Sequence, residues 1–267
     1  MQDLHITYLQ SSLHWESSEE NRKMFGTKLE AITGVTDLIL LPEMFNTGFS
    51  MNPEVTAEGM DGSTIRWMRD MAQRKSCVIA GSVAIEENGN YFNRMVWMKP
   101  DGTLEKYDKR HLFRYGNEHL HYQAGKEKLV TTLKGWKICP LICYDLRFPV
   151  WARNRWKVSG TEVSADYDLL LYVANWPEVR NFPWKTLLPA RAIENQAYVA
   201  GVNRVGLDGN KMSHSGDSAV YNFKGELLTR PNVNLEVQET IRLSHAELDN
   251  FRKSFPAGRD ADEFTLG

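Results

Sequence analysis

Short apolar runs alternate with segments of helical spacing along the whole chain. The runs that read as strands cover residues 4–9, 37–42, 77–85, 91–98, 104–107, 136–142, 168–174, 198–205 and 218–223. Two of them, 37–42 and 168–174, are almost entirely aliphatic, which is typical of strands that are covered on both faces. Such an alternation of strands and helices indicates an α/β protein.

Helices are predicted between the strands from the spacing of their apolar residues. They follow residue 17, begin at residue 63, cover 149–158 and 183–196, and follow residue 244. Ser17 with Glu20, and Ser244 with Glu247, have the spacing of a capping box, in which the side chain of the first residue accepts a backbone N–H of the helix.

Turn-rich stretches between neighbouring strands, such as residues 86–90, predict hairpins that a purely parallel, doubly wound sheet would not contain. Two mixed sheets packed on each other, with helices on the outer faces, fit the pattern better. A length of 267 residues is at the upper edge of what one core organises, and the chain shows no repeat and no Pro/Gly/Ser linker. We therefore expect one domain over residues 1–267.

Composition narrows the classes of partner. The 32 basic and 34 acidic side chains give a net charge of −2, which argues against non-specific binding of nucleic acid or of an anionic membrane. The N-terminus lacks the pattern of a signal peptide, and no apolar run approaches the ~18 residues of a membrane span. Three cysteines cannot form a disulfide framework and suggest free thiols. A cytoplasmic protein is the expectation.

Three reactive side chains follow directly on strongly apolar or extended segments, where α/β folds place their sites. Glu43 follows the run 37–42, Cys143 ends the run 136–142, and Lys109 follows the extended piece 104–107. A partly desolvated glutamate can act as a general base. A cysteine has an ordinary pKa of about 8.5, and a nearby ammonium in a dry pocket can lower it enough for ionisation. A lysine can supply that ammonium or stabilise an oxyanion.

Each of these residues also has an ordinary structural interpretation. Glutamates and lysines in loops are usually solvated, and free cysteines are usually small buried hydrophobes. Cys77 and Cys139 fit the latter description, because their strand segments carry no charged neighbour.

Other constellations are weaker. Cys139, Cys143, His119 and His121 could be taken for a zinc set, but two cysteines four positions apart on a strand lie about 13 Å from each other. A Cys–His hydrolase with His111 or His214 as the base stays open. The glycine patterns of phosphate-binding loops are absent from the sequence.

Taken together, the segments around the three residues resemble a known family. Leu40-Leu41-Pro42-Glu43-Met44-Phe45, Tyr107-Asp108-Lys109-Arg110-His111-Leu112-Phe113 and Ile142-Cys143-Tyr144-Asp145-Leu146-Arg147-Phe148-Pro149 resemble the three signature segments of the nitrilase superfamily of carbon–nitrogen hydrolases. The stretches 175–177 and 190–199 are similar to further recurrent segments of that family. The resemblance spans residues 4–240 or so, with the segments in the family's order.

The resemblance implies an α-β-β-α sandwich of four layers, which usually dimerises, and a Glu-Lys-Cys triad. The matching positions are Glu43, Lys109 and Cys143, and a second family glutamate matches Glu118. Cys143 would attack an amide carbonyl, Lys109 and the backbone N–H of Tyr144 would receive the oxyanion, and Glu43 would move the protons. No metal or organic cofactor is expected.

Within the superfamily, residues 45–50 and 143–149 look most like the bacterial omega-amidases, which deamidate 2-oxoglutaramate and 2-oxosuccinamate. These substrates carry a carboxylate at the end opposite the amide, so a cation should face Cys143. Arg180 is the candidate for that cation, and Phe45, Tyr144 and Trp176 complete the expected substrate-binding set. Two further arginines, Arg147 and Arg191, are interpreted as structural, paired with Asp145 or Glu194.

Three other functions stay open at this stage. A nitrilase or another aliphatic amidase would use the same triad, and a nitrile panel separates these from an omega-amidase. A small transferase would pass the thioester to an amine and yield an acyl-amine instead of a free acid. A non-catalytic binding protein would release no ammonia from any amide.

Overall fold

The computed structural model describes residues 2–160 and 162–265, so the ends of the expected domain, residue 1 and residues 266–267, lie outside the described residues. Within those ranges the larger of two main sheets is six-stranded and mixed. Its spatial order is β15 (Val237–Leu243), β1 (Leu4–Gln10), β2 (Leu38–Leu40), β3 (Val78–Glu87), β4 (Asn90–Met98) and β5 (Leu104–Asp108). The strands β1, β2 and β3 are parallel, and the other neighbours pair antiparallel.

The second main sheet is five-stranded and also mixed. Its order is β14 (Ala219–Tyr221), β11 (Tyr198–Asn203), β10 (Leu169–Ala174), β7 (Trp136–Ile142) and β6 (Thr131–Leu133). The three central strands, β11, β10 and β7, are parallel. Two small hairpins accompany the main sheets: β8 (Trp156–Ser159) with β9 (Glu162–Ala165), and β12 (Val205–Leu207) with β13 (Ser213–Ser215).

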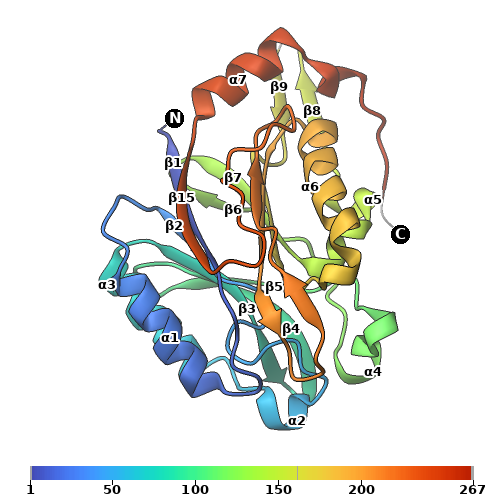
Figure 1. Ribbon diagram of the computed structural model, residues 1–267. Coiled ribbons are helices and arrows are strands. Elements are labelled where there is room, and N and C mark those ends of the chain that lie inside the picture. The colour runs from blue at the N-terminus through green and yellow to red at the C-terminus, as the bar shows by residue number, and fades with distance from the viewer. Residues whose placement is uncertain (1, 161, 266–267) are drawn as a thin grey trace.

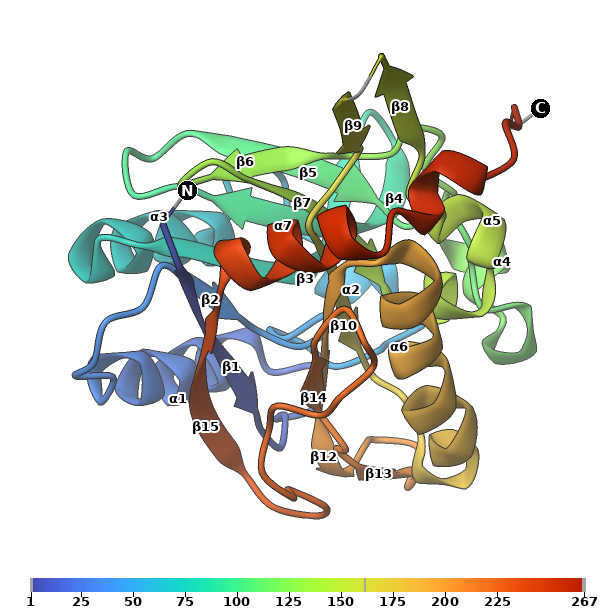
Figure 2. The same ribbon diagram turned by 90° about the horizontal axis from the view of Figure 1, so that it is seen from above.

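Helices cover the outer faces of both sheets, as Figures 1 and 2 show. The longer ones are α1 (Ser18–Glu30) and α3 (Ser63–Lys75) on the first sheet and α6 (Asn181–Asn195) on the second, with α7 (His245–Ser254) across one end. Short helices are α2 (Pro53–Thr56), α4 (Glu118–His121) and α5 (Pro149–Ala152). The expected α-β-β-α sandwich is therefore confirmed. None of the helices in the described ranges is long and apolar enough to cross a membrane.

Alternation of side chains along the strands explains the layers. In β3 and β4, Ala80 and Trp97 face the second sheet, whereas Ile79 and Val96 face α1 and α3. On the other side, α6 approaches β11 so closely that a Cβ on Gly201 would lie within 2.8 Å of Leu188 and Trp184 side-chain atoms. This glycine is what lets the helix pack onto the sheet.

Several sequence-based expectations differ from the structure. The capping box at Ser244 forms, because its hydroxyl accepts the N–H of Glu247, but Ser17 makes no such side-chain bond. The helix expected over 149–158 ends at Ala152, and β8 begins at Trp156. The reason is that the backbone N–H of Asn154 is held by the Asn195 side chain at 2.8 Å, which draws the chain out of the helix. The edge strand β15 was not predicted at all.

Candidate active site

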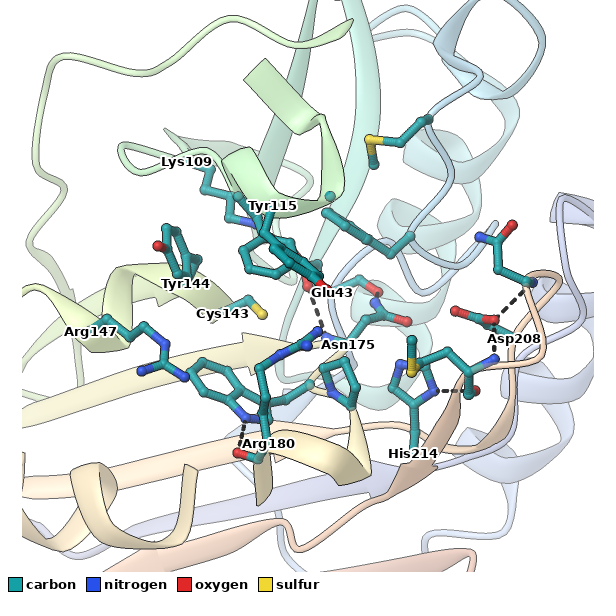
Figure 3. A pocket seen from close by; sticks show the side chains of 18 residues that line it. Glu43, Lys109, Tyr115, Cys143, Tyr144, Arg147, Asn175, Arg180, Asp208 and His214 are labelled. Atoms are coloured by element: carbon teal, nitrogen blue, oxygen red, sulfur yellow. Dashed lines mark hydrogen bonds and ion pairs between the residues drawn. The ribbon is translucent and has the colours of Figure 1, made fainter. Parts of the chain in front are cut away.

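The predicted reactive residues meet where the carboxyl ends of strands from both sheets face each other. Glu43 lies three residues beyond β2, and Lys109 directly follows β5 in the same sheet. Cys143 and Asn175 directly follow β7 and β10 of the second sheet. All four line one cavity of about 260 Å³. The structure thus brings these strand ends together around one cavity, which Figure 3 shows.

Cys143 directly follows β7 and is the first residue of a 3₁₀ helix over Cys143–Arg147. Its φ of +43° lies in the left-handed region, which is unusual for a residue with a side chain. The Asp145 carboxylate accepts the backbone N–H of Ile142 at 3.1 Å and so fastens the start of this helix. The side chain is only 9% exposed, with its sulfur directed toward Glu43 (Figure 3).

The electrostatics of the thiol differ from the sequence-based expectation. Burial raises the pKa of Cys143 well above its ordinary value, and the negative charge of the Glu43 carboxylate raises it further. The Lys109 ammonium opposes this shift without reversing it. An ammonium can favour ionisation of a thiol, but here the carboxylates of Glu43 and Glu118 already neutralise Lys109. The shift therefore favours a protonated thiol next to a base.

Lys109 is completely buried between two carboxylates. Its Nζ donates to Glu43 Oε1 at 2.7 Å and to both oxygens of Glu118 at 3.0 Å. Burial disfavours the ammonium, but the carboxylates of Glu118 and Glu43 outweigh it and raise the pKa of Lys109 above its ordinary value. The lysine is thus a permanent cation, also 5.0 Å from the centre of the Phe49 ring.

Glu118 begins α4, and its carboxylate accepts the backbone N–H of Phe113 at 2.6 Å in addition to the Lys109 bonds. Burial raises the pKa of Glu118, and the Glu43 carboxylate adds to that shift, whereas Lys109 opposes it. The structure therefore brings together all four residues expected to be catalytic.

Two asparagines complete this cluster and were not singled out by the sequence. Asn93, on β4, donates its Nδ2 to Glu43 Oε1 at 2.8 Å and to Glu118 Oε1 at 3.1 Å. Asn175 donates its backbone N–H to Glu43 Oε2 at 2.8 Å and its side-chain amide to the Glu43 carbonyl. Asn175 belongs to a stretch with family resemblance, but only its tertiary contacts disclose what it does. For Asn93 the sequence offered little signal, because β4 also carries the polar residues Asn90 and Arg94.

The expected substrate-binding residues divide into two groups. Tyr144, Trp176 and Arg180 line the cavity. Phe45 does not: it is fully buried on the outer face of the first sheet, where its ring lies 5.6 Å from that of Phe25. The expectation for Phe45 was wrong because the chain reverses after Glu43 and turns the next aromatic side chain under the helices.

The arginines also differ from expectation in one case. Arg191 pairs with Glu194 at 3.0 Å, as expected of a structural residue. Arg147 instead lines the cavity, with its guanidinium 5.1 Å from the centre of the Trp176 ring. Arg180 lies 5.3 Å from the centre of the Phe113 ring. Among the residues that the structure describes, neither Arg147 nor Arg180 forms an ion pair with a carboxylate.

The histidines considered as alternative bases have other surroundings. His111 is stacked on Phe148 at 3.8 Å, and its Nδ1 is 2.8 Å from Asp145, outside the cavity lining. His214 does line the cavity, but burial, aided by the Arg204 charge, lowers the pKa of His214 to about 4. Within residues 2–160 and 162–265, no group of three His, Cys, Asp or Glu side chains is placed to hold a metal ion, so the zinc set of the sequence does not assemble there.

The remaining cysteines lie in the core, as expected. Burial raises the pKa of Cys77 to about 11 and that of Cys139 to about 12.

Comparison with known proteins agrees with this geometry. A family model for carbon–nitrogen hydrolases matches residues 9–249. The chain is 48% identical to the omega-amidase YafV of Escherichia coli K12 over 266 residues, covering all of both proteins. It is 33% identical to the 2-oxoglutaramate amidase of Bacillus subtilis over 260 residues, which cover 93% of this chain and 97% of that protein.

A solved structure is similar over the whole length. XC1258 of Xanthomonas campestris, a CN-hydrolase superfamily protein with an arsenic adduct in its active site, is 49% identical and superimposes with a TM-score of 0.96, covering all of both chains. The chain therefore belongs to the carbon–nitrogen hydrolase family, the nitrilase superfamily, in the branch that holds the omega-amidases.

Proposed function

We propose that this protein is a thiol amidohydrolase that deamidates a short dicarboxylate monoamide, such as 2-oxoglutaramate or 2-oxosuccinamate, to the 2-oxo acid and ammonia. Its similarity to the omega-amidase of Escherichia coli and the 2-oxoglutaramate amidase of Bacillus subtilis supports an enzyme that hydrolyses amides. One observation carries the substrate class: a single cavity joins the buried cluster of Glu43, Lys109 and Cys143 to two arginines, Arg147 and Arg180.

In the first half of the reaction, the Cys143 sulfur attacks the amide carbonyl carbon while the thiol proton passes to Glu43. The carbonyl oxygen becomes an oxyanion that the Lys109 ammonium and the backbone N–H of Tyr144 can stabilise. When the tetrahedral intermediate collapses, the C–N bond breaks and Glu43 returns the proton to the departing nitrogen. Ammonia leaves, and an acyl thioester stays on Cys143.

In the second half, water attacks the thioester carbonyl and Glu43 takes one of its protons. The C–S bond then breaks, the carboxylic acid leaves, and the proton returns to the sulfur. Because the pKa of Cys143 is raised, the thiol needs a base in the first half, and Glu43 takes that role as well as the activation of water in the second half.

Glu118 has a supporting role in this scheme. It holds the Lys109 ammonium through two bonds of 3.0 Å and leaves that cation pointing at Glu43. A buried lysine without such a partner would tend to lose its proton, and with it the charge that stabilises the oxyanion.

The far end of the substrate is assigned to the arginines. A guanidinium without a carboxylate partner at a cavity wall offers a planar pair of donors that matches a carboxylate. Arg180 was the sequence-based candidate, and Arg147 joins it because it lines the same cavity and lies over the Trp176 ring. With the carboxylate fixed and the amide carbon within about 3.5 Å of sulfur, only a narrow range of chain lengths satisfies both ends.

Ammonia release across a panel of amides and nitriles tests this proposal. We expect 2-oxoglutaramate and 2-oxosuccinamate to exceed their homologue one carbon longer and their carboxamide-capped analogues in kcat/KM. Equal turnover of neutral short amides or nitriles would contradict the omega-amidase assignment and leave only the thiol hydrolase class. Acyl-amine product in place of free acid would indicate a transferase, and no ammonia from any substrate would indicate a binding protein.

The remaining expectations of the sequence stay predictions: one catalytic domain, a cytoplasmic location and a homodimer. Light scattering at micromolar concentration tests the dimer, which requires twice the mass of one chain. A mass equal to that of one chain would contradict it.

A further inference from the structure

The asparagine that bridges the two buried carboxylates occupies a position where a strand would ordinarily carry an apolar side chain. Asn93 is fully buried on β4, and its neighbours on the same face, Met95 and Trp97, pack into the core between the sheets. An amide in such a place must form hydrogen bonds or destabilise the fold. Its contacts are therefore informative about what it does.

The two donor bonds of Asn93 reach the same oxygens that Lys109 holds. Its Nδ2 lies 2.8 Å from Glu43 Oε1 and 3.1 Å from Glu118 Oε1, and the Lys109 Nζ lies 2.7 Å and 3.0 Å from these two atoms. Its backbone carbonyl also accepts the N–H of Lys109 at 3.0 Å. The Asn93 amide and the Lys109 ammonium are thus two donors that share the same two acceptors, Glu43 Oε1 and Glu118 Oε1.

The other end of the amide makes no compensating contact. Asn93 Oδ1 is buried and has no hydrogen-bond partner in the part of the chain that the structure describes. Rotating the amide by a half-turn would place this oxygen between two carboxylates, where it would be repelled. The Asn93 side chain is thus fixed in one orientation by the carboxylates alone, and an unsatisfied acceptor is tolerated to keep it there.

Charge counting indicates what this amide supplies. Glu43 and Glu118 share one cation, Lys109, so the cluster carries one excess negative charge when both are ionised. The other titratable groups that face them are the Cys143 thiol and the Tyr122 hydroxyl, and both carboxylates raise the pKa of each. Neither of these groups is a cation that could offset the excess negative charge. Besides Lys109, Asn93 is a side-chain donor that reaches both carboxylates, and its amide therefore stabilises their ionised forms.

We infer that Asn93 is a positioning residue that keeps the Glu43–Glu118 pair ionised around Lys109, so that Glu43 stays available as the base for Cys143. This inference deepens the proposed function and rests on it for the role of Glu43. Asn93 does not line the cavity, so its effect should appear in the proton transfer and not in substrate binding.

Alkylation of Cys143 by iodoacetamide as a function of pH, followed by tandem mass spectrometry that distinguishes Cys143 from Cys139, tests the inference without any substrate. In Asn93→Ala we expect the acidic limb of the rate to move upward by about one pH unit, because loss of a charge-assisted hydrogen bond lets a carboxylate bind a proton more readily. In Asn93→Asp, which keeps the shape but adds a third carboxyl group, the limb should move further. Turnover should show the same shift in kcat with KM unchanged.

Asn154→Ala is the matched control, since Asn154 is also a buried asparagine with several hydrogen bonds but lies among Tyr167 and Asn195, outside the cavity lining. It should lower thermal stability and leave the pH profile of alkylation unchanged. If either Asn93 variant that folds, as judged by circular dichroism, has the wild-type alkylation profile, the inference is overturned. If wild-type protein releases no ammonia from the amide panel, the proposed function fails, and the alkylation profile still decides the role of Asn93.

Discussion

The buried ionic cluster of Glu43, Lys109 and Glu118 and the arginine wall of the cavity, formed by Arg147 and Arg180, are built on opposite principles. The three side chains of the cluster are fully buried and bound to one another by hydrogen bonds of 2.7–3.0 Å. The two arginines of the wall are half-buried, lie against aromatic rings at 5.1 Å and 5.3 Å, and form no ion pair within the described residues.

This difference separates chemistry from recognition. The cluster is preorganised, because every carboxylate oxygen of Glu43 and Glu118 already has a donor before substrate arrives. The guanidinium groups of the arginine wall have no hydrogen-bond acceptor among the described residues, and their ring contacts hold the planes without occupying their donors. Changes in the cluster should therefore alter the rate for every substrate, and changes in the arginine wall should alter the choice among substrates.

The largest effect is expected from the nucleophile. Cys143→Ala should abolish ammonia release while the thermal unfolding temperature stays close to that of the wild type, because only one sulfur is removed from the cavity wall. Cys77→Ala is the matched control, since Cys77 is buried away from the cavity and should keep full activity. Ammonia release by Cys143→Ala would contradict the assignment of the chemistry to Cys143 and the buried cluster beside it.

Losses of several orders of magnitude in kcat are expected for Glu43→Gln and for Lys109→Met. Because the two residues share one hydrogen-bonded unit, the double variant should lose little more than either single one. Single-turnover kinetics on all three variants measure this. Strictly additive losses would show that the two residues act separately and would contradict a shared hydrogen-bonded unit.

A smaller effect, selective for substrates with a carboxylate, is expected at the arginine wall. For the arginine that pairs with the substrate carboxylate, the alanine variant, Arg180→Ala or Arg147→Ala, should reduce kcat/KM for 2-oxoglutaramate by about thirtyfold or more. The reason is that an unpaired buried charge costs about 2–5 kcal/mol. Neutral short amides should change by about twofold at most. A uniform loss across charged and neutral substrates would place the arginine with the catalytic unit instead.

The smallest effect concerns stability and arises from His214 in the cavity wall. Burial lowers the pKa of His214 from 6.5 to about 4 in the folded protein. A histidine with a lowered pKa stabilises the fold fully above its unfolded pKa, and that stability is lost as the pH falls toward the folded value. The free energy of unfolding should therefore decrease between pH 6.5 and 4, and His214→Gln should flatten this decrease. Denaturant unfolding at several pH values measures it, and an unchanged slope would contradict the assignment.

The sequence was sufficient to predict the layers and to name three residues that the structure brings together at one cavity. Aliphatic runs such as 168–174 identify buried strands without reference to tertiary structure, and β10 covers Leu169–Ala174. Glu43 and Cys143 stand out because each follows an apolar run, and Lys109 because it follows an extended piece; all three match a family motif.

Features that depend on distant contacts could not be read from the chain. Asn93 lies fifty residues from Glu43 and 25 from Glu118, so no local pattern joins them. The strand β15 pairs with β1 more than 220 residues away. Its sequence, VQETIRL, contains several polar residues, so the alternation of apolar positions that identifies a strand is weak. Arg147 was assigned to an ion pair because Asp145 is close in sequence, whereas that carboxylate is occupied by Tyr107 and His111.

Trapping the acyl-enzyme tests the central claim most directly. Wild-type protein is mixed with 2-oxoglutaramate, quenched in acid within the first turnovers and digested. Because Cys139 and Cys143 are only four residues apart, tandem mass spectrometry assigns any added mass to an individual cysteine. We expect the mass of the acyl group on Cys143, discharged by hydroxylamine and absent from Cys143→Ala. An acyl group on Cys77 or Cys139, or full turnover with no acylated peptide at any quench time, would contradict a Cys143 thioester.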